Sequence, residues 1–233
     1  MASWHPGLLC SCDPPHGSSL VVSDVTVPPL GLSGTLRVPA TAAGIVIFAH
    51  GSGSSRFSPR NTYVADALND SGFATLLFDL LTNEEEADRR NVFAIPLLAH
   101  RLVAAVDWSA AQSELARLPI GLFGASTGVG AALVAAARLS HRIRAVVSRG
   151  ERSDLAGHAV EAVSAPTLLI VGGRDRDVLS MNESAFGRLN CTKALKVIPG
   201  ATHLFPEAGT LDAVVTEATE WFEAHLREPK ARG

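Results

Sequence analysis

The sequence is poor in cysteine and in excess charge and has no long apolar run, and each shortage excludes a class of protein. Three cysteines among 233 residues, Cys10, Cys12 and Cys191, form neither a disulfide framework nor a zinc-like pattern. A net charge of −3 gives no electrostatic reason to expect nucleic acid. No apolar run approaches the roughly 18 residues of a membrane span. We therefore expect a reduced, cytoplasmic protein with no metal, nucleic acid or membrane partner.

The amino-terminal residues also lack the marks of a secretory signal. No Lys or Arg precedes Arg37, and Leu8 and Leu9 are the only apolar run near the start. A signal needs a basic segment followed by a longer apolar one. Residues 1–19 are instead rich in Pro, Gly, Ser and His, which predicts a flexible arm. We expect one domain over residues 20–228 and a short tail over residues 229–233.

Short apolar runs alternate with stretches of helical periodicity along the predicted domain. The runs predict eight strands, over residues 20–27, 32–38, 44–49, 74–78, 120–123, 144–147, 167–171 and 194–198. The periodic stretches predict helices over residues 61–69, 94–111, 126–138, 179–189 and 211–226. The first two strands should pair antiparallel. The alternation indicates the α/β class, with a mostly parallel sheet between two helical layers and a ligand site at the carboxyl ends of the strands.

The segment Gly124-Ala125-Ser126-Thr127-Gly128 directly follows a predicted strand and opens a predicted helix. A chain that turns this sharply forces the serine into a strained backbone and permits only small residues two positions away. The turn would lift the Ser126 hydroxyl above the sheet, at a helix amino terminus that favours negative charge. The alternative is a glycine-rich turn in which Ser126 is merely an N-cap.

A serine hydroxyl needs a base, and the base needs a group that orients it. Asp175 follows the predicted strand 167–171, and His203 follows the predicted last strand. The chain order is therefore Ser126, Asp175, His203, as in α/β-hydrolases. Asp177 is the alternative to Asp175 for the orienting role. For His203, the alternative is a purely structural role.

The developing oxyanion would need two backbone amides. We expect one from Thr127, directly after Ser126, and the other from the loop after the third predicted strand. That loop contains His50, Gly51 and Ser52, and we favour the amide of Ser52, with Gly51 as the alternative. His50 is expected to shape the loop and to take no part in the chemistry.

These segments together resemble the α/β-hydrolase superfamily, and within it dienelactone hydrolase-like proteins. The likeness covers about residues 20–228 and includes the stretches 48–56 and 75–82 beside the serine, aspartate and histidine segments. It implies an α/β-hydrolase fold and an acyl-enzyme mechanism without a cofactor. The typical dienelactone hydrolase has a cysteine nucleophile, whereas this chain has Ser126, which favours a general serine hydrolase of esters or lactones.

The substrate is expected to be a small molecule. Only residues 149–165 separate the sixth and seventh predicted strands, which leaves no room for a large lid domain. Arg56, Arg60 and Arg149 fall on loops at the strand ends, where guanidinium groups could bind a substrate carboxylate. The alternative is that these arginines pair with acids such as Asp79 and hold the loops in place.

Other functions remain open at the level of the sequence. The same three residues could serve a thioesterase or an acyltransferase. A non-catalytic ligand-binding protein could also retain this fold, because a fold alone does not determine function. The sequence gives no indication of the oligomeric state.

Overall fold

The computed structural model describes residues 19–150 and 153–227. Its eight strands form one sheet in the order β1-β2-β4-β3-β5-β6-β7-β8. Their bounds are β1 Leu20–Val27, β2 Leu32–Pro39, β3 Ile45–Ala49, β4 Ala74–Phe78, β5 Ile120–Ala125, β6 Ile143–Arg149, β7 Thr167–Gly172 and β8 Lys193–Ile198. The predicted arm over residues 1–19 lies almost wholly outside the described residues, and the tail over residues 229–233 lies fully outside them.

The sheet is mostly parallel, as predicted. Strands β4, β3, β5, β6, β7 and β8 pair in parallel, in that order. Strand β2 pairs antiparallel with both β1 and β4. The central strands are buried along their whole length, which is why they are continuous apolar runs in the sequence.

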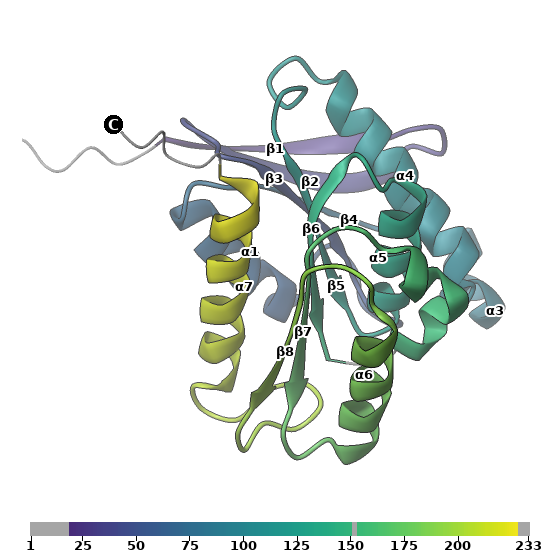
Figure 1. Cartoon of the computed structure of the whole chain (residues 1–233). Coiled ribbons are helices and arrows are strands. Elements are labelled where there is room, and N and C mark those ends of the chain that lie inside the picture. The colour runs from purple at the N-terminus through teal and green to yellow at the C-terminus, as the bar shows by residue number, and fades with distance from the viewer. Residues whose placement is uncertain (1–18, 151–152, 228–233) are drawn as a thin grey trace, which may run out of the picture.

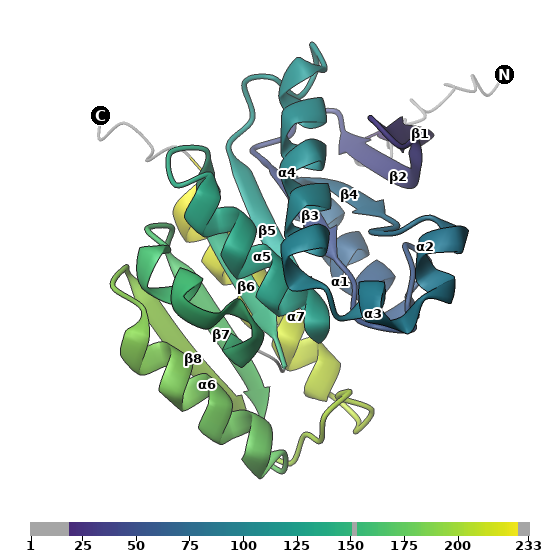
Figure 2. The ribbon, with the colours of Figure 1, turned by 90° about the vertical axis from the view of Figure 1, so that its right-hand side faces the viewer.

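Helices cover both faces of the sheet (Figures 1 and 2). One face carries α4, α5, α6 and the 3₁₀ helix η1, and the other carries α1 and α7. The bounds are α1 Pro59–Asp70, α4 Ile95–Ala111, α5 Thr127–Arg138, η1 Ser153–Ala162, α6 Arg176–Arg188 and α7 Thr210–Leu226. Each face has its own apolar cluster, one containing Leu102 and Leu133 and the other Val64 and Phe222. This arrangement confirms the predicted α/β-hydrolase fold class.

Two short helices, α2 (Asn83–Ala87) and α3 (Arg89–Val92), were not predicted from the sequence. They follow β4 and have no buried residues, so they leave no apolar periodicity to detect. The connection from β6 to β7 has only η1 among its described residues, which agrees with the expected lack of a large lid domain. No helix in the described part of the chain is long and apolar enough to span a bilayer.

Candidate active site

The residues singled out in the sequence meet at one edge of the sheet. Ser126 follows β5, Asp175 follows β7 and His203 follows β8, and these strands run parallel. The loop from His50 to Arg56 follows β3 at the same edge. The carboxyl ends of parallel strands are where open α/β sheets bind ligands. The sheet topology therefore gathers these side chains from segments far apart in the sequence.

Ser126 stands in a strained backbone between β5 and α5. Its φ of 56° and ψ of −130° are unusual for a residue with a side chain and cost about 1–3 kcal/mol. The flanking glycines allow the turn, because a Cβ on Gly124 would lie 2.7 Å from the Cα of Val129. A Cβ on Gly128 would lie 2.2 Å from the carbonyl oxygen of Ala49. Both expected small positions are therefore required by close backbone packing.

His203 and Asp175 are in direct contact. The Nδ1 atom of His203 lies 2.6 Å from Oδ2 of Asp175. This contact holds the ring with Nδ1 toward the carboxylate, so Nε2 is the nitrogen left to act as a base. The competing Asp177 lies in the first turn of α6 and is exposed. The geometry thus pairs His203 with Asp175.

The loop that carries His203 is closed by Glu207. The Glu207 carboxylate accepts hydrogen bonds from the Thr202 backbone N–H at 3.1 Å and from the Thr202 hydroxyl at 2.6 Å. The hydroxyl bond first, and the backbone bond second, lower the pKa of Glu207. Phe205 within this loop is buried and has a φ of 55°. The His203 side chain is itself 43% exposed, so burial alone does not fix it. The closed loop restrains its position instead.

Backbone contacts bring the His203 loop close to Ser126. The Ser126 N–H donates to the carbonyl of Arg149 at 3.5 Å, at the end of the neighbouring strand β6. The next residue, Gly150, would place a Cβ 3.6 Å from the carbonyl oxygen of His203. The serine and the histidine loop therefore contact successive residues of one segment.

The loop after β3 lies against the Ser126 side chain. A Cβ on Gly51 would meet the Ser126 Cβ at 2.5 Å and its Oγ at 3.0 Å, so only glycine fits there. The Ser54 N–H donates to the Gly51 carbonyl at 3.3 Å, which closes a turn around Ser52. Thr127 is the first residue of α5, so its amide has no partner within the helix. Ser52 and Thr127 thus lie on two segments that adjoin the Ser126 side chain.

His50 holds this loop to the neighbouring strand end. Its Nε2 accepts the Leu80 backbone N–H at 3.1 Å, and its Nδ1 lies 3.0 Å from the Gly51 carbonyl. An accepting Nε2 must be unprotonated, so the ring is neutral and Nδ1–H donates to Gly51. Burial lowers the pKa of His50 and supports the same state. These contacts agree with the structural role expected from the sequence.

A pocket of about 200 Å³ opens beside the β3 loop. Thr127 and the loop from His50 to Phe57 form one wall. The other walls come from the end of β4, from α2 and α3, and from the start of α4. These contribute Asp79, Leu80, Leu81, Asn83, Glu86, Val92 and Leu98. The pocket thus starts at the expected oxyanion hole and is small enough for a short acyl or alkyl group.

The three arginines do not converge on this pocket. The Arg56 side chain forms an ion pair with Asp79, and the Arg56 backbone N–H donates to Asp79 Oδ1 at 2.8 Å. Arg149 is buried, and its Nη2 donates to Asn61 Oδ1 at 3.1 Å. Arg60 lies in the first turn of α1. Of the three, only Arg56 borders the pocket, and its contact with Asp79 is the loop-holding alternative that the sequence left open.

Two contributors to the site were missed in the sequence. The α2–α3 segment forms a wall of the pocket, and Glu207 holds the histidine loop. Thr82 and Glu85 form a capping box at the start of α2, so the pattern Thr-x-x-Glu in the sequence was a usable signal for that helix. Glu207 left no such signal, because its contact with Thr202 depends on a tight loop.

The chain matches a family model over most of its length. Residues 32–226 match the model described as the dienelactone hydrolase family. A crystal structure of a dienelactone hydrolase from Anabaena variabilis superposes with a TM-score of 0.87 at 53% sequence identity. The alignment covers 91% of this chain and all of that one. Est1E from Butyrivibrio proteoclasticus gives a TM-score of 0.70 at 17% identity over 87% of this chain and 98% of that one, which shows the fold alone.

Two curated relatives from two strains of Mycobacterium tuberculosis have a different name. Each is 55% identical over 223 residues and carries the provisional name phosphoribosyl transferase. The match covers 96% of this chain but 50% of each relative. The chain therefore spans about half the length of the curated relatives it matches.

Proposed function

Since the chain belongs to the dienelactone hydrolase family, we propose that it is a serine hydrolase of small carboxylic esters or lactones. Ser126 is the nucleophile, His203 the general base, and Asp175 the group that orients the imidazole. The amides of Thr127 and Ser52 form the oxyanion hole, with Gly51 as the alternative to Ser52. No cofactor is part of this reaction, and the partner is the small-molecule substrate.

The observation that carries the proposal is the backbone of Ser126. A strained residue with a side chain, between two glycines that admit no Cβ, is maintained only where the surrounding structure supports it. The Ser126 hydroxyl lies against the β3 loop, since a Cβ on Gly51 would be 3.0 Å from its Oγ. A plain N-cap serine would need no such conformation, and Ser126 makes no side-chain capping bond.

In the proposed cycle, Nε2 of His203 takes the Ser126 hydroxyl proton while Oγ attacks the ester carbonyl carbon. The carbonyl oxygen becomes an oxyanion held by the two amides. The imidazolium then protonates the departing alkoxide, which leaves as an alcohol and yields an acyl-serine. Water attacks the acyl group as His203 takes its proton, and the carboxylic acid and the free serine are released.

The transferase name of the longer relatives does not contradict this proposal. Residues 32–226 match the hydrolase family, and the hydrolase structure from Anabaena variabilis aligns with nearly the whole chain. About half of each relative has no counterpart in this chain. We propose that the name refers to that other half. The cytoplasmic location expected from the composition stays a prediction.

The first test is hydrolysis of p-nitrophenyl acetate, butyrate and octanoate by the wild type and by Ser126→Ala. We expect the short esters to be cleaved, octanoate more slowly because the pocket is small, and a loss of at least about a thousandfold in the variant. Ser180→Ala, an exposed serine on α6, is the matched control. A fluorophosphonate probe should label the wild type and the control but not Ser126→Ala.

Two further readouts sharpen this test. Circular dichroism must show that Ser126→Ala is folded, and full activity in that folded variant would contradict the serine mechanism. If the folded wild type shows no turnover and is not labelled by the probe, a binding role would be favoured. An added alcohol that is converted to its ester would reveal acyl transfer on the same residues, whereas a thioester cleaved faster than its matched ester would indicate a thioesterase.

A further inference from the structure

The charge of the substrate pocket follows from few side chains. Of the described residues that line it, four are ionisable: His50, Arg56, Asp79 and Glu86. His50 is neutral, because its Nε2 accepts the Leu80 amide. The charge that a bound substrate meets is therefore decided by one arginine and two carboxylates.

Arg56 is already engaged on two sides. Its guanidinium forms an ion pair with Asp79, whose other oxygen accepts the Arg56 backbone N–H. The ring of Phe57 lies 4.1 Å from the guanidinium carbon. Both members of the ion pair are about one-fifth exposed, which limits screening of their mutual attraction. A substrate carboxylate would have to compete with Asp79 for this cation, so Arg56 and Asp79 together contribute no net charge.

Glu86 supplies the remaining charge. It is an exposed residue of α2 at the pocket wall, and its side chain forms no ion pair with a Lys or Arg among the described residues. Its charge also acts on His50: burial lowers the pKa of that ring, and Glu86 opposes the shift to a smaller extent. Arg89, a nearby cation, borders the adjoining hollow and stands over the ring of Phe93, 5.9 Å from its centroid. The lining of the pocket thus carries one net negative charge.

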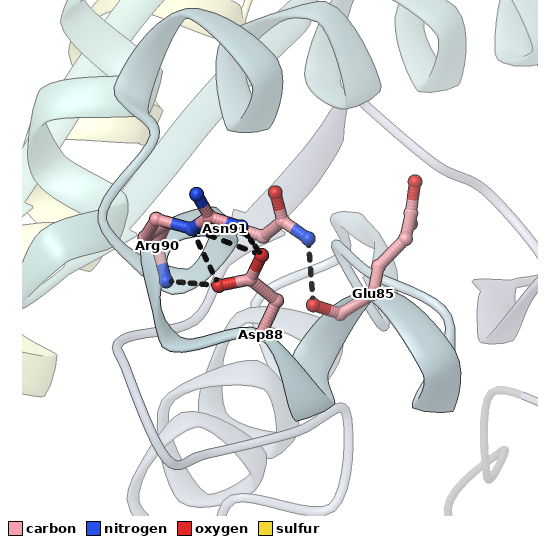
Figure 3. A network of polar contacts seen from close by, with 4 residues as sticks. All are labelled: Glu85, Asp88, Arg90 and Asn91. Carbon is pink, nitrogen blue, oxygen red and sulfur yellow. Dashed lines mark hydrogen bonds and ion pairs between the residues drawn. The ribbon is translucent and has the colours of Figure 1, made fainter.

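The corner between α2 and α3, next to Glu86 in the sequence, is closed by contacts of Glu85, Asp88, Arg90 and Asn91 (Figure 3). The Asn91 side chain donates to the Glu85 carbonyl at 2.8 Å, which ties α3 back to α2. Asp88 caps α3 and accepts the Arg90 guanidinium at 2.7 Å. Glu85 also accepts Arg101 of α4 at 2.7 Å. Because Glu85 and Asp88 on either side of it are bonded, this corner keeps α2 at the pocket wall, where Glu86 is an exposed lining residue.

The rest of the pocket is suited to an uncharged group. Leu80, Leu81, Val92 and Leu98 give it apolar walls. Burial of an alkyl group against them is favourable by about 25 cal/mol per Å². A carboxylate placed there would lose hydration and meet an unpaired carboxylate.

On the basis of the proposed function, we propose that this pocket selects substrates whose bound group is uncharged or cationic and rejects carboxylates, with Glu86 as the specificity-determining residue. The sequence had left open whether the arginines bind a substrate carboxylate or pair with acids such as Asp79, and this proposal takes the second alternative. The sequence could not decide between them, because the pairing of Arg56 with Asp79 and the position of Glu86 depend on tertiary contacts.

The test uses two series of phenyl esters, each with a neutral, a cationic and an anionic member, and divides every kcat/KM by the rate constant for hydroxide-catalysed hydrolysis of the same ester. One series varies the acyl half: 5,5-dimethylhexanoate, its cationic isostere 4-(trimethylammonio)butanoate, and hemiglutarate. The other varies the alcohol half: acetates of phenol, 3-(trimethylammonio)phenol and 3-hydroxybenzoic acid. In at least one series, kcat/KM of the wild type should be roughly three- to tenfold lower for the anionic ester than for the neutral one. The gap should narrow with added salt.

Glu86→Gln should bring the anionic-to-neutral ratio of kcat/KM toward one and lower the cationic-to-neutral ratio. Glu84→Gln, on the same helix but away from the pocket lining, is the matched control and should keep both wild-type ratios. A wild type that prefers the anionic ester, or ratios that Glu86→Gln leaves unchanged, would overturn the inference. Ser126-dependent cleavage of the neutral esters tests the proposed function separately. Failure to cleave any ester would overturn both.

Discussion

At the scale of single residues, backbone strain is concentrated at the site. Among the described residues, Ser126 and Phe205 are the non-glycine positions with positive φ. One carries the proposed nucleophile, and the other lies two residues after the proposed base. Such conformations persist only where surrounding contacts enforce them. Around Phe205 those contacts come from its own buried ring and from the bonds between Glu207 and Thr202.

Loss of the Glu207 carboxylate should therefore impair catalysis without weakening substrate binding. We expect Glu207→Ala to lower kcat about tenfold while KM stays within about twofold, because His203 would spend less time against Asp175. Glu207→Gln keeps an acceptor oxygen and should lose less. The measurement is steady-state kinetics on a short ester.

Glu220→Ala, an exposed position on α7, is the control for this prediction. A Glu207→Ala enzyme with wild-type kcat would show that the loop needs no such closure. Acid should weaken the same contact as the glutamine variant does, because a protonated Glu207 keeps an acceptor oxygen but loses its charge. The hydrogen bonds from Thr202 lower the pKa of Glu207, so its charged contact persists at neutral pH and is lost only as the pH falls through that lowered value.

At the scale of elements, the site depends on how closely α5 approaches the strands. The first turn of α5 lies against the end of β3, where a Cβ on Gly128 would be 2.2 Å from the Ala49 carbonyl oxygen. The same end of β3 continues into the loop with Gly51 and Ser52. The close approach of Gly128 to Ala49 therefore positions both α5 and the loop after β3.

Gly128→Ala should push α5 away from β3. We expect it to destabilise the fold by roughly 1–3 kcal/mol, since the obstructing atoms are backbone, and to reduce ester hydrolysis in whatever protein still folds. Gly187→Ala in α6 is the matched control, because a Cβ there meets nothing within 4 Å. That change should stabilise the protein by up to about 1 kcal/mol. Urea denaturation measures both, and equal midpoints for the two variants would contradict the packing argument.

At the scale of the whole molecule, the sheet separates two apolar clusters that support the strained edge from both sides. Helix α7 packs on the face opposite α5 (Figure 2). A Cβ on Gly121 of β5 would lie 2.6 Å from the ring of Phe222. Strand β5, which ends one residue before Ser126, is therefore held between α7 and α5.

Phe222→Ala should destabilise the whole domain by about 3–5 kcal/mol, since Phe222 is fully buried. Phe57→Ala removes a ring that is 66% exposed at the pocket mouth and should change stability by less than about 0.5 kcal/mol. The measurement is the free energy of unfolding in urea for both variants. Comparable losses would show that the core does not dominate stability here.

The sequence by itself determined the features that repeat along the chain. Buried parallel strands leave apolar runs, and a strand-to-helix turn leaves glycines beside its serine, so the fold class and the presence of all eight strands were predictable. The exact ends were less so, since β5 and β6 each end two residues later than predicted. The match to the dienelactone hydrolase family model and the crystal structure of the dienelactone hydrolase from Anabaena variabilis confirm the family resemblance predicted from the sequence.

Only the tertiary structure decided which groups face one another. It paired His203 with Asp175, where the sequence had also left Asp177 open, and it paired Arg56 with Asp79. It also brought α2 and α3 to the pocket. Contacts across 23 or 28 residues depend on strand order and loop geometry, neither of which leaves a local pattern. That is why the residues of the candidate site could be located from the sequence, whereas the charge of the pocket beside them could not.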